Sequence, residues 1–87
     1  MRLDKFLQVS RLVKRRTRAH ALCEGGHVAL NGVAGKPASV VRVGDRIEIS
    51  WGGRRLVAKV QAVPDRPRPT DELVEVLERI RVDEWWS

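Results

Sequence analysis

The pattern of apolar positions near the N-terminus is helical. Over residues 3–10, apolar side chains recur at intervals of three and four positions, and most of the residues between them are polar. This spacing predicts a short amphipathic helix that buries one stripe of side chains. The stripe consists of Leu3, Phe6 and Leu7.

A second helix is predicted over residues 18–24. Thr17 precedes it and is of a type that caps helix N-termini through its side-chain oxygen. The Gly25-Gly26 pair ends the helix, because glycine readily adopts the backbone conformations found just past a helix C-terminus. The buried face of this helix would contain Ala19, Leu22 and Cys23.

From residue 28 onward the apolar period changes from helical to two. Val28 and Leu30 alternate with other residues, and Asn31-Gly32 is typical of a tight hairpin turn before a short return strand at 33–34. Together with later alternating segments, this pattern predicts an α+β fold: a small, mostly antiparallel sheet with one apolar face covered by the two helices. The later strands are expected at 46–49 and 56–62, with turns at Gly44-Asp45 and Gly52-Gly53.

The C-terminal third has a different pattern. Prolines at 64, 67 and 69 break regular structure, so residues 64–70 are expected to link a domain over 1–63 to a C-terminal element over 71–87. Leu73, Val76, Leu77 and Ile80 follow helical spacing, which predicts an acidic amphipathic helix over 71–82, capped by Thr70 and followed by a tail with Trp85 and Trp86.

Composition limits the kinds of protein that this chain can be. Its 87 residues are enough for one small domain, and 43% hydrophobic with 32% charged residues is typical of a globular chain. A single cysteine cannot form an intrachain disulfide, and the sequence contains neither an apolar run long enough to span a membrane nor a signal peptide. We therefore expect a cytoplasmic protein that acts without a membrane, as a monomer.

Positive charge is concentrated at the N-terminus. The net charge is +6, and residues 1–20, with seven basic side chains and one acid, already carry an excess of six. A field of this kind attracts a polyanion by contacting its phosphates and releasing their counterions, so we predict binding to nucleic acid. The seven basic residues are Arg2, Lys5, Arg11, Lys14, Arg15, Arg16 and Arg18.

These basic side chains are expected to converge on one surface, where the N-terminus of helix 18–24 adds backbone donors for a phosphate. Arginine predominates, which suits bidentate phosphate contacts, and aromatic residues are few, so recognition of folded RNA by shape and backbone is favoured. Lys36 could add a further phosphate contact to this surface. Asp4 either complements the helix N-terminus or orients Arg2 or another nearby arginine.

The sequence offers no candidate catalytic, metal or cofactor site. His20 and His27 lack a metal-ligand spacing, and Cys23 is expected to pack as a small apolar residue. No phosphate-binding loop motif is present. We therefore predict that the protein is not an enzyme. Trp51 either packs on the sheet, which is favoured, or offers a stacking face to a base.

An ordered series of motifs over residues 1–50 resembles a known family. The motifs are Met1-Arg2-Leu3-Asp4-Lys5-Phe6-Leu7, Arg11-Leu12-Val13-Lys14-Arg15-Arg16-Thr17, Gly25-Gly26-His27-Val28, Asn31-Gly32, Lys36-Pro37 and Gly44-Asp45. In this order they resemble the RNA-binding domain named after ribosomal protein S4, also called the alpha-L motif. The resemblance implies two helices packed on a small antiparallel sheet, with an RNA-binding groove along the helices.

Among stand-alone members, the chain is most similar to the short bacterial ribosome quality-control proteins and more distantly to the fifteen-kilodalton heat shock protein, whose basic C-terminal extension is absent. This resemblance implies binding to large ribosomal subunits obstructed by peptidyl-tRNA, in support of C-terminal alanine tailing of the stalled chain by a partner elongation factor. It also implies that Arg2 and Arg16 grip ribosomal RNA and that Lys5 and Arg15 reach ribosomal RNA or the tRNA.

Two other functions fit the same fold. The first is a non-catalytic RNA binder that acts in ribosome assembly or on a structured messenger RNA. The second is an RNA-modifying enzyme or a tRNA synthetase, since such enzymes often carry this domain, but 87 residues leave no room for their catalytic domain. The acidic segment 71–82 and the tryptophan tail match no pattern of the family.

Overall fold

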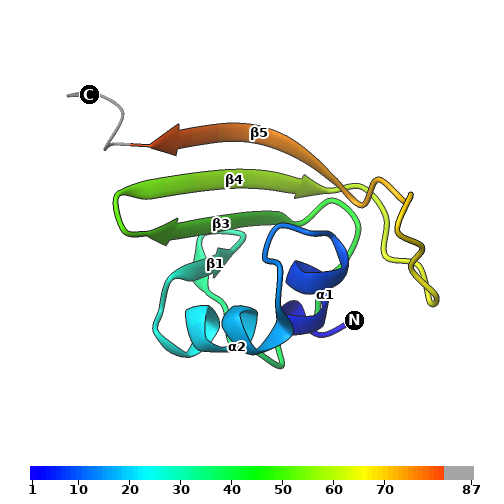
Figure 1. Ribbon diagram of the computed structural model, residues 1–87, viewed down its shortest axis with the longest axis horizontal. Helices are drawn as coiled ribbons and strands as arrows, with labels where there is room; N and C mark the ends of the chain where they lie inside the picture. The colour runs from blue at the N-terminus through cyan, green and yellow to red at the C-terminus, as the bar shows by residue number, and fades with distance from the viewer. Residues whose placement is uncertain (82–87) are drawn as a thin grey trace.

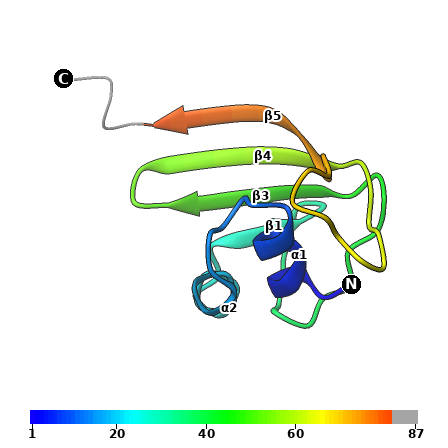
Figure 2. The same cartoon turned by 45° about the vertical axis from the view of Figure 1, so that its right-hand side comes forward.

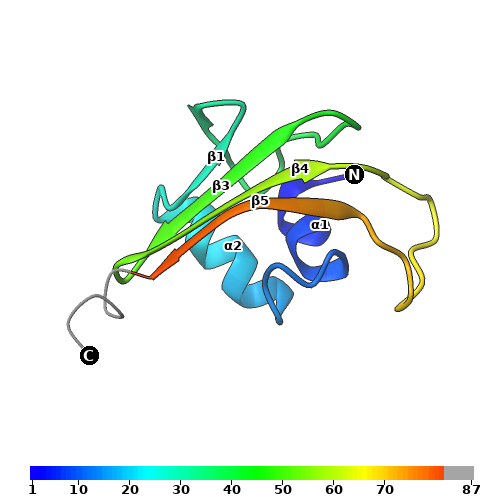
Figure 3. The same ribbon diagram turned by 90° about the horizontal axis from the view of Figure 1, so that it is seen from above.

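A computed structural model describes residues 1–81, so the predicted tail with Trp85 and Trp86 lies outside the described residues. Five strands form one antiparallel sheet in the order β2-β1-β3-β4-β5 (Figure 1). Both helices lie on the same side of this sheet (Figures 2 and 3), which confirms the predicted α+β architecture. The elements are α1 (Leu3–Val9), α2 (Arg16–Glu24), β1 (Val28–Leu30), β2 (Val33–Ala34), β3 (Arg46–Trp51), β4 (Arg54–Val60) and β5 (Val74–Arg81).

The core lies between the helix pair and the sheet. Apolar side chains of α1 and α2 pack against the inward-facing positions of β1, β3 and β4, as the alternating pattern predicted. Burial of this apolar surface provides the main stabilisation of a domain of this size. The fully or almost fully buried residues include Leu3, Phe6, Leu7, Ala19, Leu22, Cys23, Val28, Ile47 and Val60.

The first hairpin confirms the turn predicted at Asn31-Gly32. Both residues have positive φ angles, 53° and 80°, which is the conformation of the two-residue turn whose twist matches antiparallel strands. The Asn31 side chain also donates a hydrogen bond to Asp45 Oδ1 at 3.0 Å and accepts one from the Arg46 backbone N–H at 2.9 Å. The turn is therefore tied to the start of β3.

The start of α2 differs from the prediction. The helix begins at Arg16, and the extended residue before it, Arg15, makes no side-chain capping hydrogen bond. Thr17 is consequently inside the first helical turn, and its predicted role as N-cap is wrong. A capping residue must have non-helical backbone angles, which a residue within the helix does not have.

The C-terminal helix predicted over 71–82 is also wrong. Residues 61–73 connect β4 to β5 without a helix or strand, and β5 then pairs with β4. Val74 lies opposite Val60, and Val76 lies opposite Ala58, so β5 extends the apolar face of the sheet. A strand here also provides partners for the backbone N–H and C=O groups at the second edge of β4, which a separate helix would not do.

A β-bulge interrupts the pairing of β4 with β5. Ala58 pairs with Val76, but the preceding residue, Val57, pairs with Glu78, so Leu77 is an extra residue on β5. Beyond the bulge, each β5 side chain points to the face opposite to the one it would occupy in an uninterrupted ladder.

Neither α1 nor α2 is long and apolar enough to span a membrane.

Candidate nucleic-acid interface

The buried carboxylate of Asp4 is the centre of a polar cluster between α1 and α2. Only 4% of its side chain is exposed, and its Oδ1 accepts a hydrogen bond from the Lys5 backbone N–H at 2.8 Å. Arg2 donates to both carboxylate oxygens, from Nε at 3.2 Å and from a terminal nitrogen at 3.3 Å. A terminal nitrogen of Arg16 lies 3.4 Å from Oδ1, and His20 Nδ1 lies 3.5 Å from Oδ2. We call these four residues (Arg2, Asp4, Arg16 and His20) the Asp4 cluster.

Backbone contacts fix the residues of the cluster in place. The segment 39–41 runs beside the N-terminus, where the Leu3 N–H donates to the Ser39 carbonyl at 2.7 Å and Arg2 forms a β-bridge with Val40. Arg16 is the first residue of α2, and His20 follows it by four positions, so both side chains lie on one face of that helix. Packing of α1 on α2 brings this face to Asp4.

The contacts of Asp4 favour its ionised form. Burial by itself would raise the pKa of the Asp4 carboxyl. Hydrogen bonds from Arg2 and from the Lys5 backbone N–H, the contact with His20 and the charge of Arg16 oppose burial and hold this pKa below its ordinary value of 3.8. The carboxylate is therefore charged at neutral pH and attracts both guanidinium groups.

Replacing Asp4 with asparagine is expected to remove an acid-sensitive part of the stability. Because the pKa of Asp4 is lowered by folding, its contribution is fully present above about pH 4 and is lost as pH falls through the folded-state value. The measurement is urea unfolding of both proteins, followed by circular dichroism, at pH values from 7 to 2. The difference in unfolding free energy between them should shrink as the pH falls below about 4; a difference that stays the same between pH 4 and pH 2 contradicts this assignment.

Arg2 and Arg16 keep free surface despite their contact with Asp4. Their side chains are 51% and 47% exposed, and a guanidinium has five N–H donors, of which Asp4 engages only some. Asp4, Arg16, Thr17 and His20 also line an open hollow of about 390 Å³. The buried carboxylate thus holds two arginines in a fixed arrangement while their outer donors remain available to a phosphate.

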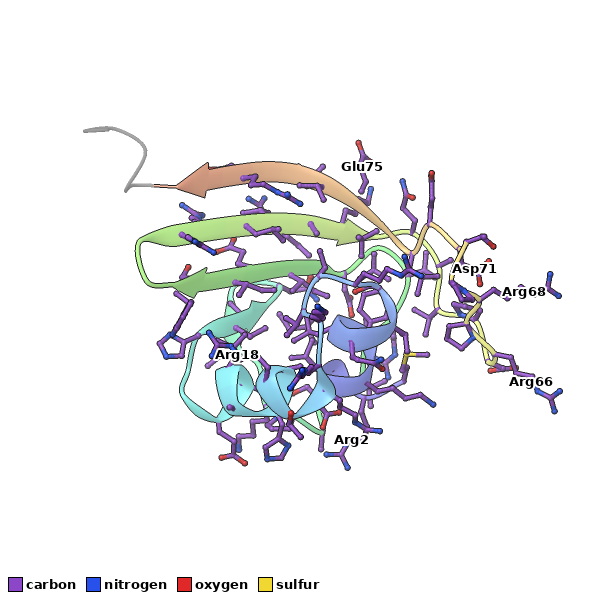
Figure 4. The ribbon with its side chains drawn as sticks, viewed as in Figure 1. Arg2, Arg18, Arg66, Arg68, Asp71 and Glu75 are labelled. Carbon is purple, nitrogen blue, oxygen red and sulfur yellow. The ribbon has the colours of Figure 1, made fainter. Side chains whose placement is uncertain are left out.

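The structure places five of the predicted basic residues in two groups. Arg2 and Arg16 belong to the Asp4 cluster, whereas Arg11, Lys14 and Arg18 line a groove on the sheet side of α2. In Figure 4, Arg2 lies below the helices, on the side away from the sheet, and Arg18 lies between α2 and β3.

Three further predicted residues lie outside both groups. Lys5 projects from α1 and is exposed, and Arg15 is exposed at the N-cap of α2. Lys36 is exposed in the loop before residue 39, whose backbone contacts the start of α1. Their proposed contacts with RNA remain predictions.

The contact between Asp4 and His20 was not predicted from the sequence. The pattern that could have identified it is the spacing of four between Arg16 and His20, which places both on the helix face that carries the cluster. His20 Nε2 also lies 3.1 Å from Glu24 Oε1, so the ring is between two carboxylates. His27 is elsewhere, with Nδ1 3.0 Å from the Ser50 carbonyl oxygen.

The favoured interpretation of Trp51 was that its ring packs on the sheet. The structure gives the ring a different environment. Trp51 is 45% exposed, and the Arg18 guanidinium lies over its ring, 4.0 Å from the centroid.

Cys23 is buried in the core, as predicted. Burial, together with the nearby charges of Asp4 and Glu24, raises the pKa of the Cys23 thiol to about 11, so the thiol is protonated at neutral pH. Among residues 1–81, no group of three His, Cys, Asp or Glu side chains is placed to hold a metal ion.

Comparison with known proteins identifies relatives of the whole chain. The family model for the S4 domain matches residues 1–47. A protein from Listeria innocua named RQC P-site tRNA stabilizing factor is 41% identical over 86 residues, which cover 97% of this chain and 94% of the relative. The protein of the same name from Streptococcus pneumoniae is 37% identical, with 97% and 98% covered. A trimeric structure of Heat Shock Protein 15 from Vibrio cholerae superposes with a TM-score of 0.77 at 32% identity, covering 87% of this chain and 80% of the other.

Proposed function

Because this chain belongs to the S4 domain family, we propose that it is an RNA-binding protein of ribosome quality control that stabilises P-site tRNA on obstructed large ribosomal subunits. Its ligands in this proposal are ribosomal RNA and the tRNA of a peptidyl-tRNA. It binds as a monomer in the cytoplasm, without catalysing a reaction. Bound there, it supports the partner elongation factor that adds alanine to the C-terminus of the stalled chain.

The observation that carries the proposal is the pair of arginines held by Asp4. Arg2 comes from the segment before α1, and Arg16 comes from the start of α2, yet both guanidinium groups contact the same buried carboxylate. An arginine that is already ordered loses less side-chain entropy when it binds a phosphate. Such an arrangement suits recognition of the RNA backbone by shape and charge.

Charge outside the cluster favours binding to a large polyanion. Lys5 and Arg15 are exposed near the Asp4 cluster along the chain, and Lys36 is exposed in the loop that packs on the start of α1. Contacts spread over several exposed bases act together through counterion release. The affinity for the subunit should consequently fall steeply as salt concentration rises.

The experiment that tests the proposal is co-sedimentation with purified large subunits, with and without peptidyl-tRNA. Arg16→Ala removes a charge-assisted contact worth about 1.5–3 kcal/mol, so binding to the subunit that carries peptidyl-tRNA is expected to weaken roughly tenfold or more. The matched control is Arg66→Ala. Arg66 is an exposed arginine in the connection before β5, far from Arg2 in Figure 4, and its removal changes net charge by the same amount.

Undiminished binding by the Arg16→Ala protein, with the control unchanged, would contradict the proposed role of the cluster. Equal binding to vacant subunits and to those with peptidyl-tRNA would contradict P-site tRNA stabilisation. That second result would instead favour a general binder of structured RNA.

A further inference from the structure

A second basic surface lies on the sheet side of α2. The bend after α1, the side of α2 toward the sheet and the ends of β3, β4 and β5 enclose a groove of about 480 Å³, within the range of roughly 300–1,000 Å³ of pockets that hold small organic molecules. Figure 3 shows α2 beneath the half of the sheet that ends in the β3–β4 turn. We call this hollow the Trp51 groove; it is lined by Arg11, Leu12, Val13, Lys14, Arg18, Leu22, Ile49, Trp51, Arg54, Arg55, Leu56 and Arg79.

The charge of the Trp51 groove is of one sign. Six of its twelve lining residues are basic and none is acidic. The Arg55 side chain lies on the opposite face of the sheet, where one of its terminal nitrogens is 3.5 Å from Glu48 Oε2. The other five (Arg11, Lys14, Arg18, Arg54 and Arg79) form no ion pair with a carboxylate of the described residues. Like charges gathered in this way repel one another, and an anionic ligand relieves that repulsion.

Strand pairing places the basic side chains above an apolar floor. Gly52 and Gly53 have φ angles of 56° and 76°, so the β3–β4 turn is tight and Trp51 lies directly opposite Arg54, on the same face. Ile49, Leu56 and Leu22 continue the floor. The β5 bulge determines the third strand's contribution: Arg79 lies opposite Leu56, a position that Glu78 would occupy in an uninterrupted ladder.

Arg11 adds an independent observation. Its φ angle of 64° is in the left-handed region, where glycine costs least and a long side chain is uncommon. An arginine at such a strained position after α1 suggests that its side chain has a functional role. That side chain lines the Trp51 groove.

We infer that the Trp51 groove binds an unpaired nucleotide of RNA, with its phosphates on Arg11, Arg54 and Arg79 and its base against Trp51. A base has both an apolar surface and a face that stacks on an indole or a guanidinium, so it can stack either on the Arg18 guanidinium that lies over the Trp51 ring or on the ring in place of that guanidinium. An acidic peptide would satisfy the cations but would not use the aromatic floor. The inference rests on the proposed function only in taking RNA as the ligand.

The test measures fluorescence anisotropy of a labelled single-stranded octamer of adenylate, compared with the same octamer made abasic. The wild-type protein should bind the base-bearing octamer at least fivefold more tightly, and Trp51→Leu should remove most of that preference. The double variant Arg54→Ala/Arg79→Ala should weaken binding of both octamers and lower the magnitude of the slope of log affinity against log salt concentration by about 1.4. Arg66→Ala is the control, and circular dichroism checks that each variant is folded.

Equal binding of the two octamers by the wild-type protein would overturn the inference, as would unchanged binding by both groove variants. Polyglutamate of matched charge that competes as well as the octamer would also overturn it and would favour an acidic peptide. Arg16→Ala separates this result from the proposed function: if that protein loses the ribosomal subunit but Trp51→Leu leaves the octamer unaffected, only the present inference fails.

Discussion

Replacing Asp4 with alanine is expected to weaken binding to large subunits that carry peptidyl-tRNA by roughly 10- to 100-fold. The variant has a higher net positive charge, so simple electrostatics predicts tighter binding to RNA. The opposite result is expected because Asp4 fixes two arginines at once. Without it, Arg2 and Arg16 must be ordered at the moment of binding, and part of each charge-assisted contact, worth about 1.5–3 kcal/mol, is lost.

The control for this experiment is Asp65→Ala, which changes the net charge equally at an exposed position in the connection before β5. It should bind as well as the wild-type protein or slightly better. The same co-sedimentation assay applies, at a temperature at which circular dichroism shows both variants to be folded. Tighter binding by Asp4→Ala would show that the cluster acts only through its total charge.

The largest expected loss of stability follows from Phe6→Ala. Phe6 is completely buried and is the largest side chain in the core, between the helix pair and the sheet. Its truncation removes apolar burial and leaves a cavity, which together cost about 3–5 kcal/mol. Small domains are stable by roughly 5–15 kcal/mol in total, so the substitution should remove roughly a fifth to all of the wild-type stability.

Urea unfolding followed by circular dichroism measures this loss as a lower midpoint. Val33→Ala provides the comparison, because Val33 is also apolar but is 70% exposed on β2. Its effect should be within about 0.5 kcal/mol of zero. A Phe6→Ala protein that loses less than about 1 kcal/mol would mean that the core closes around the missing ring.

The two helices and the first hairpin could be predicted because their signals are local. The stripe of Leu3, Phe6 and Leu7 needs only helical geometry, and Asn31-Gly32 determines its turn through its own backbone preferences. The boundaries were less well determined: β4 covers Arg54–Val60, whereas alternation suggested 56–62. Boundaries depend on which neighbouring strand a residue pairs with, and sequence spacing does not show that.

The last strand was mistaken for a helix because its bulge alters the spacing of apolar residues. A regular strand alternates with a period of two, but the extra residue Leu77 shifts the phase between Val76 and Glu78. The result places apolar residues three and four positions apart, which is the spacing of a helix. The segment forms a strand because β4 offers it a free edge to pair with, and that edge exists only in the folded sheet.

The candidate site was predicted in part. Composition and charge indicated the arginines, and the suggestion that Asp4 orients Arg2 agrees with the contacts in the structure. The Trp51 groove was not predicted, since Arg18, Trp51 and Arg79 meet only through tertiary packing. The Trp51-Gly52-Gly53-Arg54 segment contained a usable signal, because a two-residue turn puts its flanking side chains on the same face of the hairpin.

The position of β5 at the edge of the sheet has a consequence for solubility. An edge strand of eight residues presents a row of unpaired backbone groups on which a strand from another molecule could assemble. Charged side chains at Glu75, Glu78 and Arg79, and the kink at Leu77, oppose such growth along the strand. We therefore expect the irregularity in β5 to disfavour edge-to-edge association of this small protein when it is free of RNA.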